Sequence, residues 1–429
     1  MLKLLRTGLC SLLLAGTTVF SLHAEDAPAA PKGLILKKGQ RVAVIGDSIT
    51  EQKQYSKFIE LYLTACRPDL DLHVLQFGWG GETAGGFVNR MENDLIPYKP
   101  DVATTCYGMN DGGYKAYEEG TGKGYTANMV KIIERVKKEG ATVVVGTPGA
   151  VDTKYFRGGG EAPTVYNATL KKLGELDQEL ATKYGMPFAD VHAPMIAAME
   201  KGKAALGPDY DVCGRDGVHP NANGHLIMAY AFIKGMGFDG NLATFTVDMN
   251  GKAEASEGHT ITSSEKGKVE IESTRYPFCF FGDEKSPGGN RSILPFLPFN
   301  DDLNRFTLVV KNLDWDKAKV TWGAGSKTFT KAELAKGINL AAEFIDNPFS
   351  EPFKKVGDAI SGKENYETDM IKGIITNFPR MKHCIEGDKE VEAIIETLRT
   401  KLMGRYEKLQ SDTKALVVPV KHTLTITKE

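Results

Sequence analysis

The fold of the first half of the chain is decided by one stretch, Val42-Ala43-Val44-Ile45-Gly46-Asp47-Ser48-Ile49-Thr50. Its apolar residues 42–45 predict a buried strand. Ser48 follows at the point where this strand would pass into a helix. The stretch therefore predicts an exposed, geometrically fixed serine hydroxyl at the carboxyl end of a strand.

Four more apolar, β-branched runs follow, and they alternate with longer helical patterns. This alternation favours a parallel sheet with helices on both faces. In such sheets ligands bind at the carboxyl ends of the strands. The further predicted strands are residues 72–77, 102–106, 141–146 and 187–191, and the predicted helices are residues 55–65, 86–95, 125–138, 165–184 and 224–236.

A second motif, Asp216-Gly217-Val218-His219-Pro220, lies far downstream, just before the last of these helices. It places a carboxylate three residues before an imidazole, so one turn can carry a general base and the group that orients it. Ser48, Asp216 and His219 are therefore candidate catalytic residues. The motif alone also fits a plain turn before a helix, because Pro220 suits the first helical position.

Two glycine-containing segments offer the chemistry of an oxyanion hole. Residues 76–83, Gln-Phe-Gly-Trp-Gly-Gly-Glu-Thr, let a backbone N–H approach a substrate closely, and Gly81 is the candidate donor. Residues 107–111, Tyr-Gly-Met-Asn-Asp, offer the amide of Asn110 as a neutral donor. Taken singly, these segments also fit a flexible loop and a turn. Their position after strand-like runs favours the catalytic interpretation.

In this order, the four blocks resemble the SGNH/GDSL hydrolase family of esterases and lipases over roughly residues 40–235. The resemblance implies a three-layer, flavodoxin-like α/β/α fold and ester hydrolysis without a metal or cofactor. It implies that Ser48 is the nucleophile, with Asp216 and His219 completing the triad. Its oxyanion hole would be formed by the N–H groups of Ser48 and Gly81 and the amide of Asn110.

The chain departs from the family pattern in the second block. Glu82 replaces the aspartate of the usual Gly-Asp-Thr, and Gln76 stands where many members have asparagine. We expect Asp47, Glu82 and Asp111, which flank the proposed site residues, to support the loops or the substrate rim. His225, six residues after His219, is interpreted as a surface or supporting residue.

The N-terminus predicts secretion. Lys3 and Arg6 precede the apolar residues 9–19, and small residues follow near position 24. We expect a signal peptide over residues 1–24, a linker over 25–39, and a secreted or periplasmic protein without integral membrane association after cleavage. The apolar segment is short for a membrane span, which needs about 20 residues.

Composition limits the partners. The formal net charge of −2 gives no case for nucleic-acid binding. The length of 429 residues exceeds one typical domain, so a second unit is expected. We predict a hydrolase domain over residues 40–240 and a β-sandwich-like accessory domain over 241–429.

Short alternating runs in this second unit predict antiparallel strands, and the pattern turns helical over about residues 331–413. We interpret the helical part as an insertion in the β-domain. Aromatic residues 276–281, Trp315 and Trp322 fit a core or, alternatively, a sugar-stacking face. The predicted strands are residues 243–247, 259–262, 268–272, 305–310, 319–322 and 416–426.

A secreted member of this family with an appended β-rich domain resembles a carbohydrate esterase, so the resemblance implies a serine esterase that removes O-acetyl groups from carbohydrate. A lipase, lysophospholipase or thioesterase is the enzymatic alternative, and a lipase would need a large apolar acyl pocket near Ser48. A non-catalytic glycan-binding protein on the same fold is the alternative of another class. Separation of Ser48 from His219 beyond hydrogen-bond reach would favour it.

Overall fold

The computed structural model describes residues 32–385 and 387–429. The first half contains a parallel sheet in the order β2-β1-β3-β4-β5, which confirms the predicted fold class. The proposed signal peptide over 1–24 lies outside the described residues. The strands are β1 (Arg41–Gly46), β2 (His73–Gln76), β3 (Val102–Cys106), β4 (Thr142–Gly146) and β5 (Phe188–Ala189).

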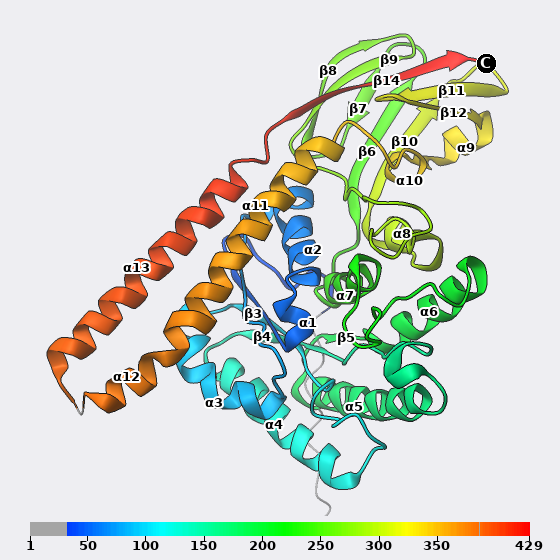
Figure 1. The fold of residues 1–429 in the computed structure, drawn as a ribbon. Coiled ribbons are helices and arrows are strands. Elements are labelled where there is room, and N and C mark those ends of the chain that lie inside the picture. Colours follow the sequence, from blue (N-terminus) through cyan, green and yellow to red (C-terminus); the bar gives the residue numbers. More distant parts are fainter. Residues whose placement is uncertain (1–31, 386) are drawn as a thin grey trace, which may run out of the picture.

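Helices cover both faces of this sheet (Figure 1). Successive strand residues face opposite sides, so Val42 and Val44 pack in the core cluster of α2 and α7, whereas Ala43 and Ile45 pack with α3 and α4. Helix α6 was not predicted from the sequence, because this helix is only weakly amphipathic.

No helix in the described part of the chain is both long and apolar enough to cross a membrane. The helices are α1 (Ser48–Glu51), α2 (Tyr55–Leu61), α3 (Ala84–Asp94), α4 (Glu119–Lys138), α5 (Ala162–Tyr184), α6 (His192–Leu206) and α7 (Ala222–Gly235).

The second part of the chain forms two β-sheets, in the orders β13-β10-β6-β7 and β12-β11-β14-β9-β8. The prediction that all its strands are antiparallel was wrong for one pair, since β6 and β10 run parallel. The chain leaves β6 to build β7, β8 and β9 before it returns to β10, which provides the long crossover that a parallel pair requires. The strands are β6 (Asn241–Asp248), β7 (Ala253–Ala255), β8 (His259–Glu265), β9 (Lys268–Ser273), β10 (Arg305–Lys311), β11 (Lys317–Trp322), β12 (Gly325–Thr330), β13 (Ile338–Asn339) and β14 (Val420–Lys428).

Aromatic side chains fill the interior of this second part. Trp322 and Tyr276 are fully buried, and Phe278 and Phe280 are 1% exposed. Phe306 stacks on Trp322 with ring centroids 5.6 Å apart. These side chains form core and are not available to stack on a sugar, whereas Trp315 and Phe281 are partly buried.

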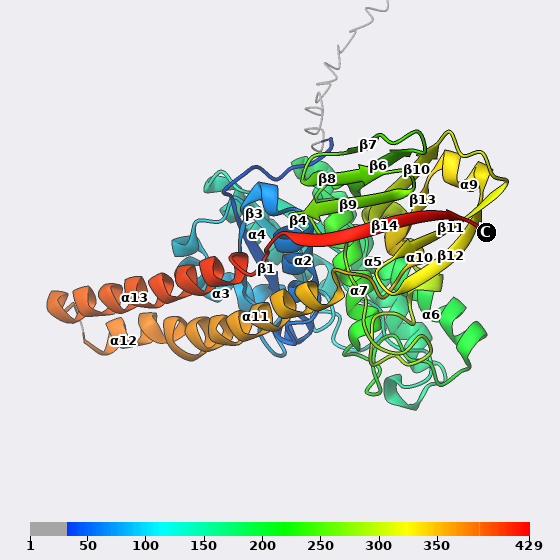
Figure 2. The ribbon, with the colours of Figure 1, turned by 90° about the horizontal axis from the view of Figure 1, so that it is seen from above.

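The C-terminal half also contains a helical arm, residues 350–414. Its main helices are α11 (Ser350–Thr368), α12 (Phe378–Cys384) and α13 (Lys389–Lys414), and a π-helical turn at Asp369–Ile374 follows α11. Figures 1 and 2 show α11 and α13 side by side, extending away from the two β-sheets of the C-terminal part. The arm interrupts the β-region in sequence, yet α11 packs against α2 and β2 of the first half. Shorter helices α8 (Phe299–Leu303), α9 (Lys331–Lys336) and α10 (Leu340–Glu343) contact β10.

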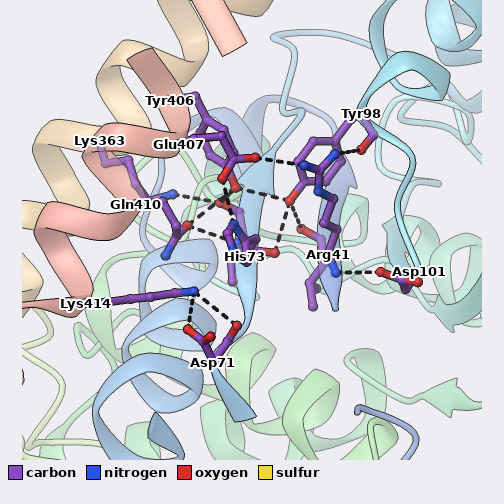
Figure 3. A network of polar contacts seen from close by, with 12 residues as sticks. Arg41, Asp71, His73, Tyr98, Asp101, Lys363, Tyr406, Glu407, Gln410 and Lys414 are labelled. Atoms are coloured by element: carbon purple, nitrogen blue, oxygen red, sulfur yellow. Dashed lines mark hydrogen bonds and ion pairs between the residues drawn. The ribbon is translucent and has the colours of Figure 1, made fainter. Parts of the chain in front are cut away.

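Polar contacts join the arm to the edge of the parallel sheet (Figure 3). Glu407 of α13 lies 3.0 Å from the Arg41 guanidinium and 2.8 Å from Nδ1 of His73. Lys414 Nζ lies 2.7 Å from the Asp71 carboxylate. Edge strand β2 is therefore covered by the arm, which protects its unpaired backbone groups from another chain.

Candidate active site

The structure brings three of the predicted site residues together. The Ser48 hydroxyl Oγ lies 2.8 Å from Nε2 of His219, and Nδ1 of His219 lies 2.6 Å from Oδ2 of Asp216. A carboxylate only accepts hydrogen bonds, so Nδ1 carries the imidazole proton and Nε2 is free to accept the hydroxyl proton of Ser48. This is the geometry that an activated serine nucleophile requires.

Local structure holds the serine at its position. Asp47 caps α1 by accepting a hydrogen bond from the Ile49 N–H at 2.9 Å. Ser48 is the first residue of this helix, so its backbone N–H has no intrahelical acceptor. The hydroxyl and a free N–H donor therefore stand at the carboxyl end of β1.

The turn before α7 orients the imidazole. Oδ1 of Asp216 accepts hydrogen bonds from the N–H groups of Val218 and His219, both at 2.9 Å. Burial raises the pKa of Asp216, but these backbone hydrogen bonds and the His219 ring outweigh it and hold the pKa below its ordinary value. Asp216 is therefore ionised at neutral pH and stabilises a protonated His219.

The loop after β2 carries the candidate oxyanion donor Gly81. Its φ of +71° is a conformation that glycine adopts without strain, and within the described residues its N–H donates to no protein acceptor. The Trp79 N–H donates to the carbonyl oxygens of Gly46 and Asp47, at 3.1 and 3.2 Å. These bonds tie the loop directly to the serine turn.

Asn110, after β3, lies next to this loop. Its Nδ2 donates to the Glu82 carbonyl oxygen at 3.0 Å and lies 3.5 Å from Oδ2 of Asp47. Its Oδ1 accepts a hydrogen bond from the Tyr114 hydroxyl at 2.9 Å. Because Oδ1 is occupied by Tyr114, the Asn110 amide presents its N–H side to the loop that carries Gly81.

The three flanking carboxylates hold loops, and none of them lines the pocket at Ser48. Glu82 accepts two hydrogen bonds from the Arg90 guanidinium, at 2.6 and 2.7 Å. Asp111 accepts from the N–H groups of Ala84 and Gly108, both at 3.0 Å. Burial raises the pKa of Asp47 to about 7 and that of Asp111 to about 6.

Sequence reasoning missed two pocket residues. An open pocket of about 300 Å³ is lined by Glu51, Gln52 and the three residues of the serine–histidine–aspartate group. Oε1 of Gln52 lies 2.8 Å from Nε2 of buried His225. Burial lowers the pKa of His225 to about 3, so this histidine stays neutral and its Nε2–H can donate to Gln52. The two missed residues, Glu51 and Gln52, follow Ser48 within about one helical turn, and that proximity was the signal available in the sequence.

The first half of the chain is similar in sequence to known esterases. A family model described as "GDSL-like Lipase/Acylhydrolase family" matches residues 44–227. An acetylxylan esterase of Geobacillus stearothermophilus is 26% identical over 223 residues, which are 47% of this chain and 95% of that protein. A crystal structure of that esterase aligns with a TM-score of 0.40 at 24% identity, covering 47% of this chain and 96% of the other.

One solved structure covers both parts of the chain. It is a gut microbial diltiazem-metabolizing enzyme, with a TM-score of 0.70 and 24% sequence identity. The alignment covers 94% of this chain and 100% of that one. The parallel-sheet part and the C-terminal part therefore recur together as one fold.

Proposed function

Residues 44–227 of this chain belong to the GDSL-like lipase/acylhydrolase (SGNH) family, and from this premise we propose that the esterase removes acetyl groups from carbohydrate esters through an acyl-serine intermediate. The observation that carries the proposal is the 2.8 Å contact between the Ser48 hydroxyl and Nε2 of His219. The acetylxylan esterase similarity supports an acetylated sugar as the substrate. Secretion, predicted from the N-terminus, would bring the enzyme to polysaccharides outside the cell.

The chemistry follows from the geometry of the proposed triad. His219 takes the Ser48 proton as Oγ attacks the ester carbonyl, and Asp216 stabilises the imidazolium. The N–H groups of Ser48 and Gly81 and the Asn110 amide stabilise the oxyanion. Collapse of the tetrahedral intermediate breaks the bond to the alcohol, which leaves with the proton from His219. Water, activated by the same histidine, then hydrolyses the acyl-serine.

The pocket at Ser48 favours a small acyl group. Its lining residues are all polar or charged, and it is open to solvent. Sites for long acyl chains are lined predominantly by apolar side chains. Among the described residues, no apolar side chain lines this pocket at Ser48, which argues against a lipase or lysophospholipase.

A non-catalytic glycan-binding role is less well supported. Ser48 and His219 are within hydrogen-bond reach, and the aromatic residues 276–281 that could stack on sugars are mostly buried. A binding protein would not need a serine hydroxyl aligned with an imidazole and an ionised carboxylate.

The proposal is tested with 4-nitrophenyl esters of increasing acyl length and with acetylated xylan. We expect kcat/KM to fall at least about 10-fold from acetyl to octanoyl, because no apolar side chain in the described part of the chain lines the pocket to receive the extra methylenes. Release of acetate from xylan would establish the carbohydrate substrate. A preference for octanoyl over acetyl would contradict the proposal and favour a lipase.

Asn110→Ala tests the oxyanion hole. We expect kcat to fall about 100-fold with a smaller change in KM, because a donor to the oxyanion acts in the transition state. Steady-state kinetics on the acetyl ester give both constants. Tyr114→Phe is the comparison variant: it keeps the Asn110 amide and removes only the hydroxyl that orients it, so kcat should fall less than in Asn110→Ala. A rise in KM with unchanged kcat would instead make Asn110 a substrate-binding residue.

A further inference from the structure

The helical arm contacts the loop that carries Gly81. Gln76, the last residue of β2, donates from its backbone N–H to Glu367 of α11 at 3.0 Å. Its side-chain Nε2 donates to Oγ1 of Thr368 at 2.7 Å. Its Oε1 accepts a hydrogen bond from the N–H of Gly78, at 2.8 Å. Gln76 therefore links the arm to the start of the loop.

A second contact lies nearer to the serine. Lys372, in the π-helical turn after α11, forms an ion pair with Glu51, which lines the pocket. The Lys372 Nζ also lies 5.0 Å from the centre of the Trp79 ring, and the Arg90 guanidinium lies 4.9 Å from the same ring. Two cations therefore contact the indole through cation–π interactions.

The loop has little room between these contacts. A Cβ on Gly78 would lie 2.2 Å from the backbone N of Glu51, and one on Gly80 would lie 2.8 Å from Oε2 of Glu51. The loop backbone thus packs directly on α1, the helix that begins with Ser48. Displacement of Trp79 or Glu51 would shift the Gly81 N–H relative to the Ser48 hydroxyl.

We propose that Lys372 is a positioning residue for ester hydrolysis: through Trp79 and Glu51, it holds the loop of the oxyanion donor Gly81 against the helix of the nucleophile. The inference rests on the proposed function, because it takes the loop as one side of the oxyanion hole. It makes the helical arm a part of the active site, although the arm lies outside the region matched by the family model.

The test compares Lys372→Met, which keeps the aliphatic length and removes the charge, with Lys372→Arg, which keeps the charge. We expect Lys372→Met to lower kcat on 4-nitrophenyl acetate about 10-fold with KM within about 2-fold, because small displacements of catalytic groups cost rate. Lys372→Arg should stay within about 3-fold of wild type, since arginine also forms ion pairs and cation–π contacts.

Lys382→Met is the matched control. Lys382 lies on α12 of the same arm, is 37% exposed against 36% for Lys372, and pairs with Glu396 of α13 rather than with the active site. This variant should keep wild-type kcat. If Lys372→Met changes kcat no more than Lys382→Met, or if Lys372→Arg is as impaired as Lys372→Met, the proposal is wrong.

A readout without turnover separates this inference from the proposed function. The chain has three tryptophans, so the indole N–H resonance of Trp79 can be assigned by its loss in Trp79→Phe. Lys372→Met should shift this resonance, whereas Lys382→Met should not. Wild-type protein inactive on every ester would overturn the proposed function. An unshifted Trp79 resonance in Lys372→Met would overturn the positioning role.

Discussion

Ser48→Ala is expected to abolish ester hydrolysis, with kcat lower by about 10⁴–10⁶-fold, because the proposed acyl intermediate forms on the Ser48 hydroxyl. Alanine removes only the hydroxyl that lies 2.8 Å from His219. The Asp47 cap of α1 accepts from the Ile49 N–H and is untouched, so the fold should persist. Turnover of 4-nitrophenyl acetate and the thermal unfolding midpoint measure the two effects.

The control for Ser48→Ala is the same substitution at an exposed loop position, Ser286→Ala, which should retain full activity. Covalent labelling provides a second check. A fluorophosphonate probe should modify wild-type protein on the peptide that contains Ser48 and leave Ser48→Ala unlabelled. Turnover by Ser48→Ala comparable to wild type would exclude Ser48 as the nucleophile.

Of the variants considered, Lys363→Met is expected to cause the largest loss of stability. The Lys363 side chain is completely buried between Glu60 of α2 and Glu367 of α11, and its Nζ also donates to the Val74 carbonyl oxygen at 2.7 Å. Removing one partner of a buried ion pair costs about 3–5 kcal/mol, because the other charge is left uncompensated. Urea unfolding should show this as a lower midpoint.

The effect should depend on pH. Burial raises the pKa of Glu60 to about 7, and Lys363 opposes that rise. Without Lys363 the pKa of Glu60 in the folded protein rises further, so the folded state binds a proton more tightly than the unfolded state. Stability is then retained at low pH and lost as pH rises through the folded pKa. The loss of unfolding free energy caused by Lys363→Met should therefore be larger at pH 8 than at pH 6.

Lys354→Met is the control for the buried pair. Lys354 lies on the same helix α11, is 55% exposed and pairs with Asp358. Surface pairs contribute little to stability, so its urea midpoint should remain near that of wild type. Equal midpoints for Lys363→Met and Lys354→Met would show that the buried ammonium does not hold the arm to the sheet. Amide hydrogen exchange in α11 would show whether the loss of stability is local to this helix.

Much of the candidate site was predictable because its signals are local in sequence. Ser48, Gly81 and Asn110 each follow a strand-like run, and the carboxyl ends of parallel strands meet at one edge of the sheet. Asp216 and His219 share a single turn. The alternation of strands and helices predicted this edge, and the structure brings Ser48, His219 and Asp216 into hydrogen-bond contact there.

The contributions of distant segments were not predictable in this way. Gln76 departs from the family pattern, and the sequence offered no reason for it. In the structure its side chain bridges Thr368 and Gly78, residues that are almost 300 positions apart in sequence. Parallel pairing of β6 with β10 was missed for a related reason, since strand direction depends on the route of the connecting chain rather than on alternation within a strand.

By itself, the sequence determined the class of sheet, the edge at which the reactive groups lie and the chemistry they can perform. These follow from short-range periodicity and from motifs a few residues long. Tertiary structure alone decided that the helical arm packs on β2 and α2 and that Lys372 reaches Glu51 and Trp79. Helical periodicity predicts that a segment has an apolar face, but it does not specify which surface that face covers.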